Sequence, residues 1–314
     1  MPGVCGRCRS AAAEVELPYA RLRLCPDCFS DFFVSRVRRT VEEFRMFREG
    51  DRVGVAISGG KDSGALLHAL RSAFPGLDLV ALHVNLGIPE YSAHCQSIAE
   101  GLAGELGVEL LTFDLGRELG IGIGDFEGTA FKGKICSACG TIKRRLFEEL
   151  AMRAGARVLA TGHNLDDMVG IMLDNFLHGY WGQFVRLKPV LPPLAEGMAA
   201  RVKPLIRSPE REDLLYCLYR GIRFKEIGCP FSKGAKVRRM AGLLEAASER
   251  NPQFRHQLLN RFLELMPLIE GIAPRPEFSK CRICGFPSQG DICAYCKRIA
   301  LVKGDRGGVP SESG

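Results

Sequence analysis

A short polar segment, Ser58–Ser63 (SGGKDS), has the residue types needed to bind phosphate groups. It follows the apolar run Arg52–Ile57, which predicts a buried strand, and opens the helical pattern Asp62–Phe74. Two adjacent glycines let backbone N–H groups turn toward an anion, and the helix N-terminus points there too. The spacing before the lysine differs from the Walker pattern. The predicted phosphate-binding residues are Ser58, Gly59, Gly60, Lys61, Asp62 and Ser63.

Cysteines form a second group of chemistry-bearing residues: there are thirteen, and ten of them make five C-x-x-C pairs. A C-x-x-C turn presents two thiolates to one ion, and four thiolates complete a tetrahedral zinc shell. Two pairs lie near each end of the sequence, so each end predicts a structural zinc site. A redox role for such a pair is the alternative. The predicted ligands are Cys5, Cys8, Cys25 and Cys28 for one zinc ion and Cys281, Cys284, Cys293 and Cys296 for the other.

The fifth pair, Cys136 and Cys139, has no second pair nearby and lies just before a predicted helix. Cys229, in the segment GCPF, is the best candidate for a third thiol. Two or three thiolates leave a coordination position open, unlike the terminal quartets. The remaining cysteines, Cys95 and Cys217, lie in helix-like apolar patterns and are expected in the core.

Between the terminal cysteines the chain alternates apolar runs with helical patterns. Further strands are expected at Leu77–Val84, Val108–Phe113 and Arg157–Thr161, and helices at Thr141–Gly155 and from Leu165 onward. This alternation predicts an α/β fold with a doubly wound parallel sheet. Its ligand should lie at the carboxyl ends of the strands.

Less regular segments complete the organisation. The glycine-rich stretch Gly116–Gly133 is expected to form a mobile loop over the site, with a plain surface insertion as the alternative. A later helical pattern breaks near Asn251–Pro252. The predicted order is an N-terminal zinc finger (1–33), a linker helix (34–50), the catalytic α/β domain (51–232), a helical segment (233–274), a C-terminal zinc finger (275–300) and a disordered tail (301–314).

Composition narrows the class of protein further. The net charge of +7 favours a polyanionic partner, although a solvated basic surface explains it equally well. No apolar run is long enough for a membrane span, and the N-terminus shows no apolar signal segment. Paired cysteines without an export signal point to metal binding in a reducing compartment, so we expect a cytoplasmic protein.

The phosphate-binding segment, in its strand–turn–helix context, resembles the signature of the PP-loop ATP pyrophosphatases over roughly Asp51 to Phe184. That resemblance implies cleavage of ATP between its α- and β-phosphates, transfer of AMP to a substrate oxygen, and a five-stranded parallel sheet. With the segments CSACG, TGHNLDD and GCP, almost the whole chain resembles the TtuA/TtcA family of tRNA 2-thiolation enzymes. The two terminal zinc modules resemble the TtuA branch.

The family resemblance implies particular roles for some residues. Lys143, one helical turn after Cys139, is a catalytic or ATP-binding residue, and Asp167 is the catalytic carboxylate that holds Mg²⁺ or orients the uridine. Ala56, His83 and Gly162 line the nucleotide. The structural alternatives are a solvated basic face for Lys143, a helix N-cap for Asp167 and a packed core position for His83.

The resemblance also implies the cofactors and partners. Cys136, Cys139 and Cys229 are implied to carry a [4Fe–4S] cluster with one iron free of protein ligand. The implied activity is ATP-dependent replacement of a uridine 2-oxygen by sulfur, at T-loop position 54 of tRNA. The expected cofactors are ATP, Mg²⁺, the cluster and two Zn²⁺. The expected partners are tRNA, a second copy of the chain and a ubiquitin-like sulfur carrier with a C-terminal thiocarboxylate, with no membrane.

Four alternatives stay open at this point. The target is the wobble uridine at position 34, or a cysteine persulfide carries the sulfur. Other PP-loop enzymes form amides or lysidine, but they need no cysteine triad. A non-catalytic zinc-ribbon RNA-binding protein would not need the phosphate loop.

Basic residues predict the surface that holds tRNA by its phosphates, which provides affinity without base choice. One set lies near the first zinc module and the other follows Cys229. The candidates are Arg36, Arg38, Arg39, Arg45 and Arg48, and Lys233, Lys236, Arg238 and Arg239.

Overall fold

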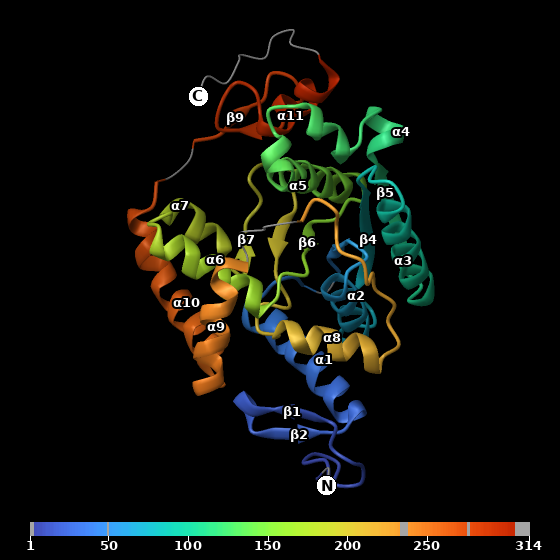
Figure 1. Ribbon diagram of the computed structural model, residues 1–314, viewed down its shortest axis with the longest axis vertical. Helices are drawn as coiled ribbons and strands as arrows, with labels where there is room; N and C mark the ends of the chain where they lie inside the picture. Colours follow the sequence, from blue (N-terminus) through green and yellow to red (C-terminus); the bar gives the residue numbers. More distant parts are fainter. Residues whose placement is uncertain (1–2, 49, 233–237, 275–276, 305–314) are drawn as a thin grey trace.

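The computed structural model describes residues 3–48, 50–232, 238–274 and 277–304. Strands of its central sheet are β3 (Arg52–Ile57), β4 (Asp78–Asn85), β5 (Glu109–Asp114), β6 (Val158–Ala160), β7 (Val190–Leu191) and β8 (Ala200–Val202). Their order is β5-β4-β3-β6-β8-β7 (Figure 1). The first five in this order run parallel, and β7 pairs antiparallel with β8 at the edge. The predicted parallel sheet is confirmed, with one antiparallel edge strand that the sequence did not reveal.

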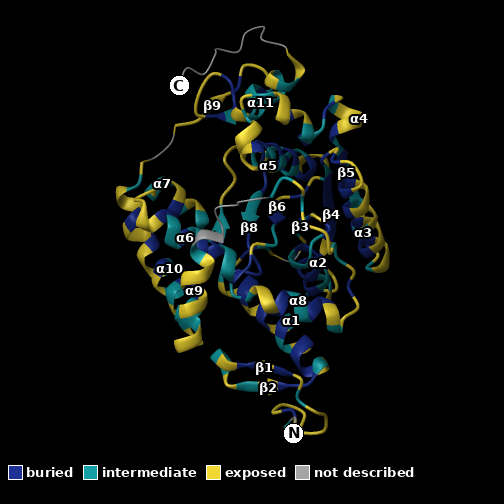
Figure 2. Ribbon diagram, viewed as in Figure 1, coloured by how far each residue is buried: buried dark blue, intermediate teal, exposed yellow. Residues whose placement is uncertain are grey.

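Helices cover both faces of the sheet. α2 (Lys61–Ala73) and α3 (Tyr91–Glu105) pack on one face, and α5 (Ile135–Arg153) packs on the other. Because neighbouring residues of a strand point to opposite faces, Ala81 and Leu82 of β4 lie in different cores. The central strands β3, β4 and β6 are therefore largely buried on both sides (Figure 2), which explains why they read as continuous apolar runs.

The first cysteine module docks on the sheet domain through a shared helix. A small hairpin, β1 (Val15–Leu17) and β2 (Leu22–Leu24), precedes α1 (Pro26–Glu43). This helix packs beside α2 and α8 (Glu210–Tyr219), and Phe33 stacks on Tyr216 with ring centroids 4.2 Å apart. The predicted boundary between zinc finger and linker helix at 33/34 thus falls inside one continuous helix.

A separate helical core lies beyond β7. It is formed by α6 (Leu165–Leu177), α7 (Trp181–Phe184), α9 (Arg238–Arg250) and α10 (Phe254–Ile272). The break between α9 and α10 confirms the one predicted near Asn251–Pro252. None of the described helices is long and apolar enough to cross a membrane.

The second cysteine module sits against α5, at the opposite end of the molecule from the first module (Figure 1). It contains β9 (Ser279–Lys280), β10 (Pro287–Ser288) and α11 (Ala294–Lys303). Arg145 of α5 stacks on Phe286, with its guanidinium carbon 3.9 Å from the ring centroid. Of the predicted disordered tail, residues 301–303 belong to α11, and residues 305–314 lie outside the described residues.

The segment Gly116–Gly133, which the sequence predicts to be a mobile loop, contains short helices that the sequence did not reveal. The segment forms α4 (Leu115–Leu119) and the 3-10 helices Ile123–Gly128 and Lys132–Lys134. Ile123 and Phe126 are buried in the core under α5. Glycines masked the short helices in the sequence, whereas tertiary burial of two side chains stabilises them.

Candidate functional site

The phosphate loop Ser58–Ser63 joins the carboxyl end of β3 to the first turn of α2. Ser63 Oγ donates to the Gly60 carbonyl at 3.0 Å, and the Ser58 N–H donates to Ser63 Oγ at 3.2 Å. Gly59 has φ +73°, and a side chain there would lie 3.0 Å from the backbone of Cys95. Glycine is therefore required at this turn. The geometry is that of a helix N-terminus prepared for an anion.

The positive charge of Lys61, the lysine of the loop, is compensated by two carboxylates of the protein. Its Nζ lies 2.7 Å from Glu210 Oε1 and 3.0 Å from Asp62 Oδ1. Burial lowers the pKa of Lys61, but these carboxylates outweigh burial and raise it. Glu210 begins α8, and no sequence motif pointed to it. As it stands, Lys61 brings little net positive charge to a bound phosphate.

The segment Gly162–Asp167 follows β6 and packs on the phosphate loop. A side chain at Gly162 would lie 3.0 Å from the backbone nitrogen of Ser63, so glycine allows two backbones to approach. Sequence reasoning missed Asn164, which donates from Nδ2 to Asp62 Oδ1 at 3.3 Å. Asn164 also caps α6 by accepting from the Asp167 N–H at 3.0 Å. Its place just before a helical pattern was the available signal.

The two neighbouring aspartates of this segment have different surroundings. Asp166 accepts from the Glu210 N–H at 2.7 Å and pairs with Arg255 at 2.8 Å, so it ties three helices together. Asp167 forms no such ion pair with any described residue. Burial and the charges of Asp62 and Glu210 raise the pKa of Asp167 to about 6. A carboxylate tuned toward neutrality beside a phosphate loop is a candidate for chemistry.

The predicted cysteine triad, Cys136, Cys139 and Cys229, lies at the N-terminal end of α5. Cys136 and Cys139 lie within its first turns, because the helix begins at Ile135 and not at Thr141 as predicted. The small residues of this segment gave no helical pattern in the sequence. The helix begins there because Ile135, Ala138 and Ile142 are buried along one of its faces. Cys136 Sγ donates to the Phe231 carbonyl at 2.9 Å, and Cys139 and Cys229 pack at the edge of the same core.

Sulfur spacing separates the quartets from this triad. Tetrahedral zinc with Zn–S bonds of about 2.3 Å places its sulfurs about 3.8 Å apart. The Sγ atoms of Cys8 and Cys25 are 3.9 Å apart, and those of Cys284 and Cys293 are 3.7 Å apart. Within each quartet all four sulfurs lie within 4.8 Å of one another, so each fits one zinc ion. Among the described residues the triad does not form such a group, so its sulfurs suit a larger cluster better than a single ion.

Positive charge gathers beside the triad. Lys143 lies four residues after Cys139 on α5, and it offsets part of the rise that burial causes in the pKa of the Cys139 thiol. Although the side chain of His163 reaches the surface, desolvation by its dense surroundings lowers its pKa, and the charges of Lys203, Lys143 and Arg144 lower it further. His163 is therefore neutral at physiological pH, and the charge of this region comes from lysine and arginine.

Three guanidinium groups extend the positive region. Desolvation by the dense surroundings of the Arg144 side chain lowers its pKa, and the nearby charges of Arg201 and Arg186 lower it further. Arg201 also donates to the buried carboxylate of Glu148 at 3.0 Å, which compensates part of this positive charge. Arg144 and Arg186 are exposed, so this surface can meet an anionic partner.

The two residues expected near the adenine lie on neighbouring strands. Ala56 is half-buried near the end of β3. His83 is only 2% exposed, and its Nδ1 donates to the Ile57 carbonyl at 2.9 Å. Burial lowers the pKa of His83, so it is a neutral, packed histidine. This matches the alternative that the sequence left open for His83, while nucleotide contact by Ala56 stays a prediction.

The predicted tRNA-binding arginines near the first quartet do not form one surface. Arg36 is buried, and its guanidinium donates to Glu212 at 2.7 Å and to Tyr19 at 2.6 Å. Its assignment to an RNA surface was wrong, because the helical face that carries it packs against α8. Of the second predicted set, the structure leaves undescribed Lys233, Lys236 and the side chains of Arg238 and Arg239.

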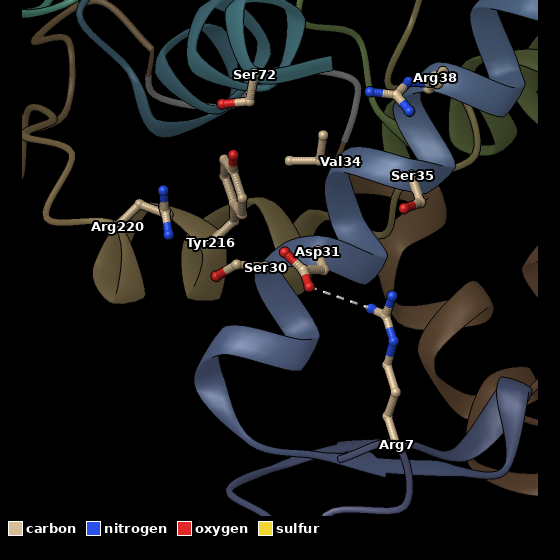
Figure 3. Close-up of a pocket in the computed structure, with 9 residues that line it drawn as sticks. All are labelled: Arg7, Ser30, Asp31, Val34, Ser35, Arg38, Ser72, Tyr216 and Arg220. Carbon is tan, nitrogen blue, oxygen red and sulfur yellow. Dashed lines mark ion pairs between the residues drawn. The ribbon is translucent and has the colours of Figure 1, made fainter.

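Arg38 from the first set lines a cavity of about 290 Å³ between α1, α2, α8 and the first module (Figure 3). Arg7 and Arg220 also line this cavity, and Arg7 pairs with Asp31 at 3.7 Å. No residue of the phosphate loop or the cysteine triad lines it. The cavity is thus separate from the site at the carboxyl ends of the strands.

Together, the twisted parallel sheet, the phosphate loop and the segment packed on it define an α/β protein of the phosphate-loop class. The PP-loop domain family matches residues 33–207. The chain is 39% identical over 295 residues to the tRNA-5-methyluridine(54) 2-sulfurtransferase of Thermus thermophilus, covering 94% of this chain and 89% of that protein. A protein of the same name from Pyrococcus horikoshii is 33% identical over 294 residues, covering 94% and 93%.

The chain therefore belongs to the PP-loop family, in the TtuA branch that its motifs indicated. A solved structure, the U34-tRNA thiolase NcsA from Methanococcus maripaludis with its [4Fe-4S] cluster, superposes with a TM-score of 0.78 at 23% identity. It covers 99% of this chain and 98% of that one, so the whole architecture is shared, terminal modules included.

Proposed function

We propose that this chain is a tRNA 2-sulfurtransferase that uses ATP to replace the 2-oxygen of the T-loop uridine at position 54 with sulfur. One observation carries the proposal: a single segment joins the phosphate loop to the cysteine triad. The Lys225 N–H donates to the Gly59 carbonyl at 2.8 Å, and Cys229 follows four residues later. ATP cleavage and sulfur chemistry therefore share one site.

The first step activates the uridine. Its O2 attacks the α-phosphorus of ATP, the bond to the bridging oxygen breaks, and pyrophosphate leaves with the electron pair. Backbone N–H groups at the start of α2 and the hydroxyls of Ser58 and Ser63 bind the phosphate oxygens. Asp167 is ionised above its pKa of about 6, and it holds Mg²⁺ or orients the uridine. Lys143 stabilises the charge that develops on the phosphate.

The second step replaces AMP by sulfur at C2. Cys136, Cys139 and Cys229 would hold a [4Fe–4S] cluster, and when bound this group would supply the site that carries the sulfur for transfer. Lys143 is one helical turn from Cys139, so it can neutralise the departing AMP phosphate beside the triad. Holding both groups in one site converts a bimolecular encounter into a step with fixed geometry.

The remaining groups position the substrate. The two quartets hold zinc and stabilise the terminal modules. The tRNA lies over the positive surface formed by Arg144, Arg186 and Arg201, whose phosphate contacts provide affinity but not base choice. The family resemblance supports a ubiquitin-like thiocarboxylate as sulfur donor, a homodimer, and a cytoplasmic setting in which tRNA is available.

Position 34 is the second candidate target. The full-length overlay with a protein described as a U34 thiolase favours it, whereas the higher identity to two position-54 enzymes favours the T-loop. Anaerobically reconstituted protein is incubated with ATP, sulfide and unthiolated tRNA, and nuclease fragments are weighed by mass spectrometry. We expect the sulfur in the T-loop fragment. Sulfur in the anticodon fragment would select position 34, and no thiolated fragment would overturn the proposal.

A further inference from the structure

Lys225 lies against the phosphate loop although no motif marked it. It belongs to the extended segment that follows α8 and leads to Cys229. Its N–H donates to the Gly59 carbonyl at 2.8 Å, and Gly59 has the positive φ of +73° that turns the loop. The backbone of Lys225 is thus fixed to the loop whatever its side chain is.

The side chain of Lys225 follows the loop toward the triad. Its Cε lies 3.6 Å from the point where a Cβ on Gly60 would be, beside the first turn of α2. Its Nζ lies 4.6 Å from the ring centroid of Tyr91 and donates to the Tyr91 hydroxyl. Burial raises the pKa of Tyr91 further above physiological pH, so this partner is uncharged. Burial lowers the pKa of Lys225 and the charge of Lys143 lowers it further, whereas Cys95, Cys229 and the more distant Asp62 act in the opposite direction.

The contrast with Lys61 shows what is unusual about Lys225. Lys61 is held by Glu210 at 2.7 Å and Asp62 at 3.0 Å. In the described part of the chain, no carboxylate oxygen lies within 4.0 Å of Lys225 Nζ. A half-buried ammonium without an anionic partner is costly, and it lies beside a helix N-terminus that also favours an anion. Among the described residues Lys225 therefore adds to the site a positive charge that no ion pair holds.

We propose that Lys225 is a phosphate-binding residue that contacts the triphosphate of ATP from the side of the cysteine triad. When the uridine oxygen attacks the α-phosphorus, negative charge builds on the bridging oxygen of the leaving pyrophosphate. The ammonium of Lys225 and the N–H groups of α2 stabilise that charge together. This inference rests on the proposed function, because it assigns a residue to ATP cleavage.

The test measures pyrophosphate release from ATP in the presence of tRNA and without sulfide, on the anaerobically reconstituted protein. Lys225→Met removes the charge but keeps a long stem and the backbone hydrogen bond to Gly59. We expect kcat/KM for ATP to fall about 100–1,000-fold, as for loss of one preorganised donor to a developing charge. Lys225→Arg should recover most of it. Arg223→Met, an exposed cation two residues earlier, should match the wild type.

The outcomes separate the inference from the function on which it rests. If the wild type releases no pyrophosphate, the proposed function fails whatever the variants do. If the wild type is active and Lys225→Met equals it, the inference is overturned. Normal pyrophosphate release with lost thiolation would also overturn it, because Lys225 would then serve the sulfur step. Equal melting temperatures of the variants would confirm that the loss is not a folding defect.

Discussion

The chain uses the same C-x-x-C spacing in two kinds of site. At each end, two pairs face each other across a small hairpin, and inter-pair sulfur distances of 3.9 Å and 3.7 Å match one tetrahedral ion. Near the middle, one pair on α5 meets a single cysteine from a loop, and the sulfurs are more widely spread. The spacing within a pair therefore does not decide its role. What decides it is whether a second pair closes the shell.

The surroundings of the two kinds of site differ as well. The first quartet packs in the hairpin module at the N-terminus, and the second packs in the module that rests on α5. The triad instead lies beside a phosphate loop, with Lys143 and Lys225 close by. Each quartet is thus arranged for one structural ion, whereas the triad lies among positive charges that suit a phosphate group.

The largest effect should come from the triad. Changing Cys136, Cys139 or Cys229 to alanine should lower thiolation by more than about 100-fold, because each removes a cluster ligand. Visible absorbance of the cluster should disappear while the melting temperature changes little. Ser137→Ala, an exposed residue between two of the cysteines, is the control and should retain activity. Full activity of all three cysteine variants would show that these thiols are not needed for sulfur transfer.

A quartet cysteine should give the opposite pattern. Cys281→Ala should lower the bound zinc from two ions per chain to one and loosen the C-terminal module, because structural zinc supplies folding energy. Elemental analysis and limited proteolysis would report this directly. Thiolation should fall less than in the triad variants. A loss of activity equal to that of Cys229→Ala, with intact zinc, would contradict the division into closed and open sites.

Asp167 tests whether the open site works through a tuned carboxylate. Its pKa is raised to about 6, so the side chain is ionised above that pH and becomes protonated as the pH falls through it. Pyrophosphate release should therefore be about tenfold slower at pH 5 than at pH 7 under saturating ATP. Asp167→Asn should be slow at both pH values and lose this dependence. An unchanged pH profile in the variant would assign the dependence to another group.

The smallest effect should come from the positive surface beside the triad. Arg144→Met should weaken tRNA binding and reduce the slope of log affinity against log salt by about one, the value for one lost phosphate contact. Filter binding over a salt series would measure it. Arg211→Met, an exposed arginine on α8, is the matched control. An equal change in both variants would mean that the tRNA is not held on the triad side.

Much of the fold could be predicted because its strands are buried on both faces. Arg52–Ile57 and its neighbours read as continuous apolar runs, and the observed strands agree with them within one or two residues. The edge strand β7 and its neighbour β8 have only two and three residues, too few for a pattern. The burial of Arg36 depends on Glu212, which is distant in the sequence, so its charge alone suggested a surface position.

The site could be predicted only where its residues form local motifs. The phosphate loop and the C-x-x-C pairs are such motifs, because turn geometry and ligand spacing act over a few residues. Glu210 and Lys225 contribute through contacts with Lys61 and Gly59 that the chain makes only after folding. Nothing in the local sequence indicates that Glu210 pairs with Lys61 or that Lys225 lies against the phosphate loop.

The most direct test of sulfur transfer through the triad compares cluster-loaded protein with protein from which only the cluster has been removed. Both are given ATP, tRNA and free sulfide under strict anaerobiosis, and the 2-thiolated nucleoside is measured by mass spectrometry. We predict that only the cluster-loaded form thiolates tRNA, while both keep their two zinc ions. Full activity of the cluster-free form would contradict the account, because free sulfide would then replace AMP at C2 without the cluster.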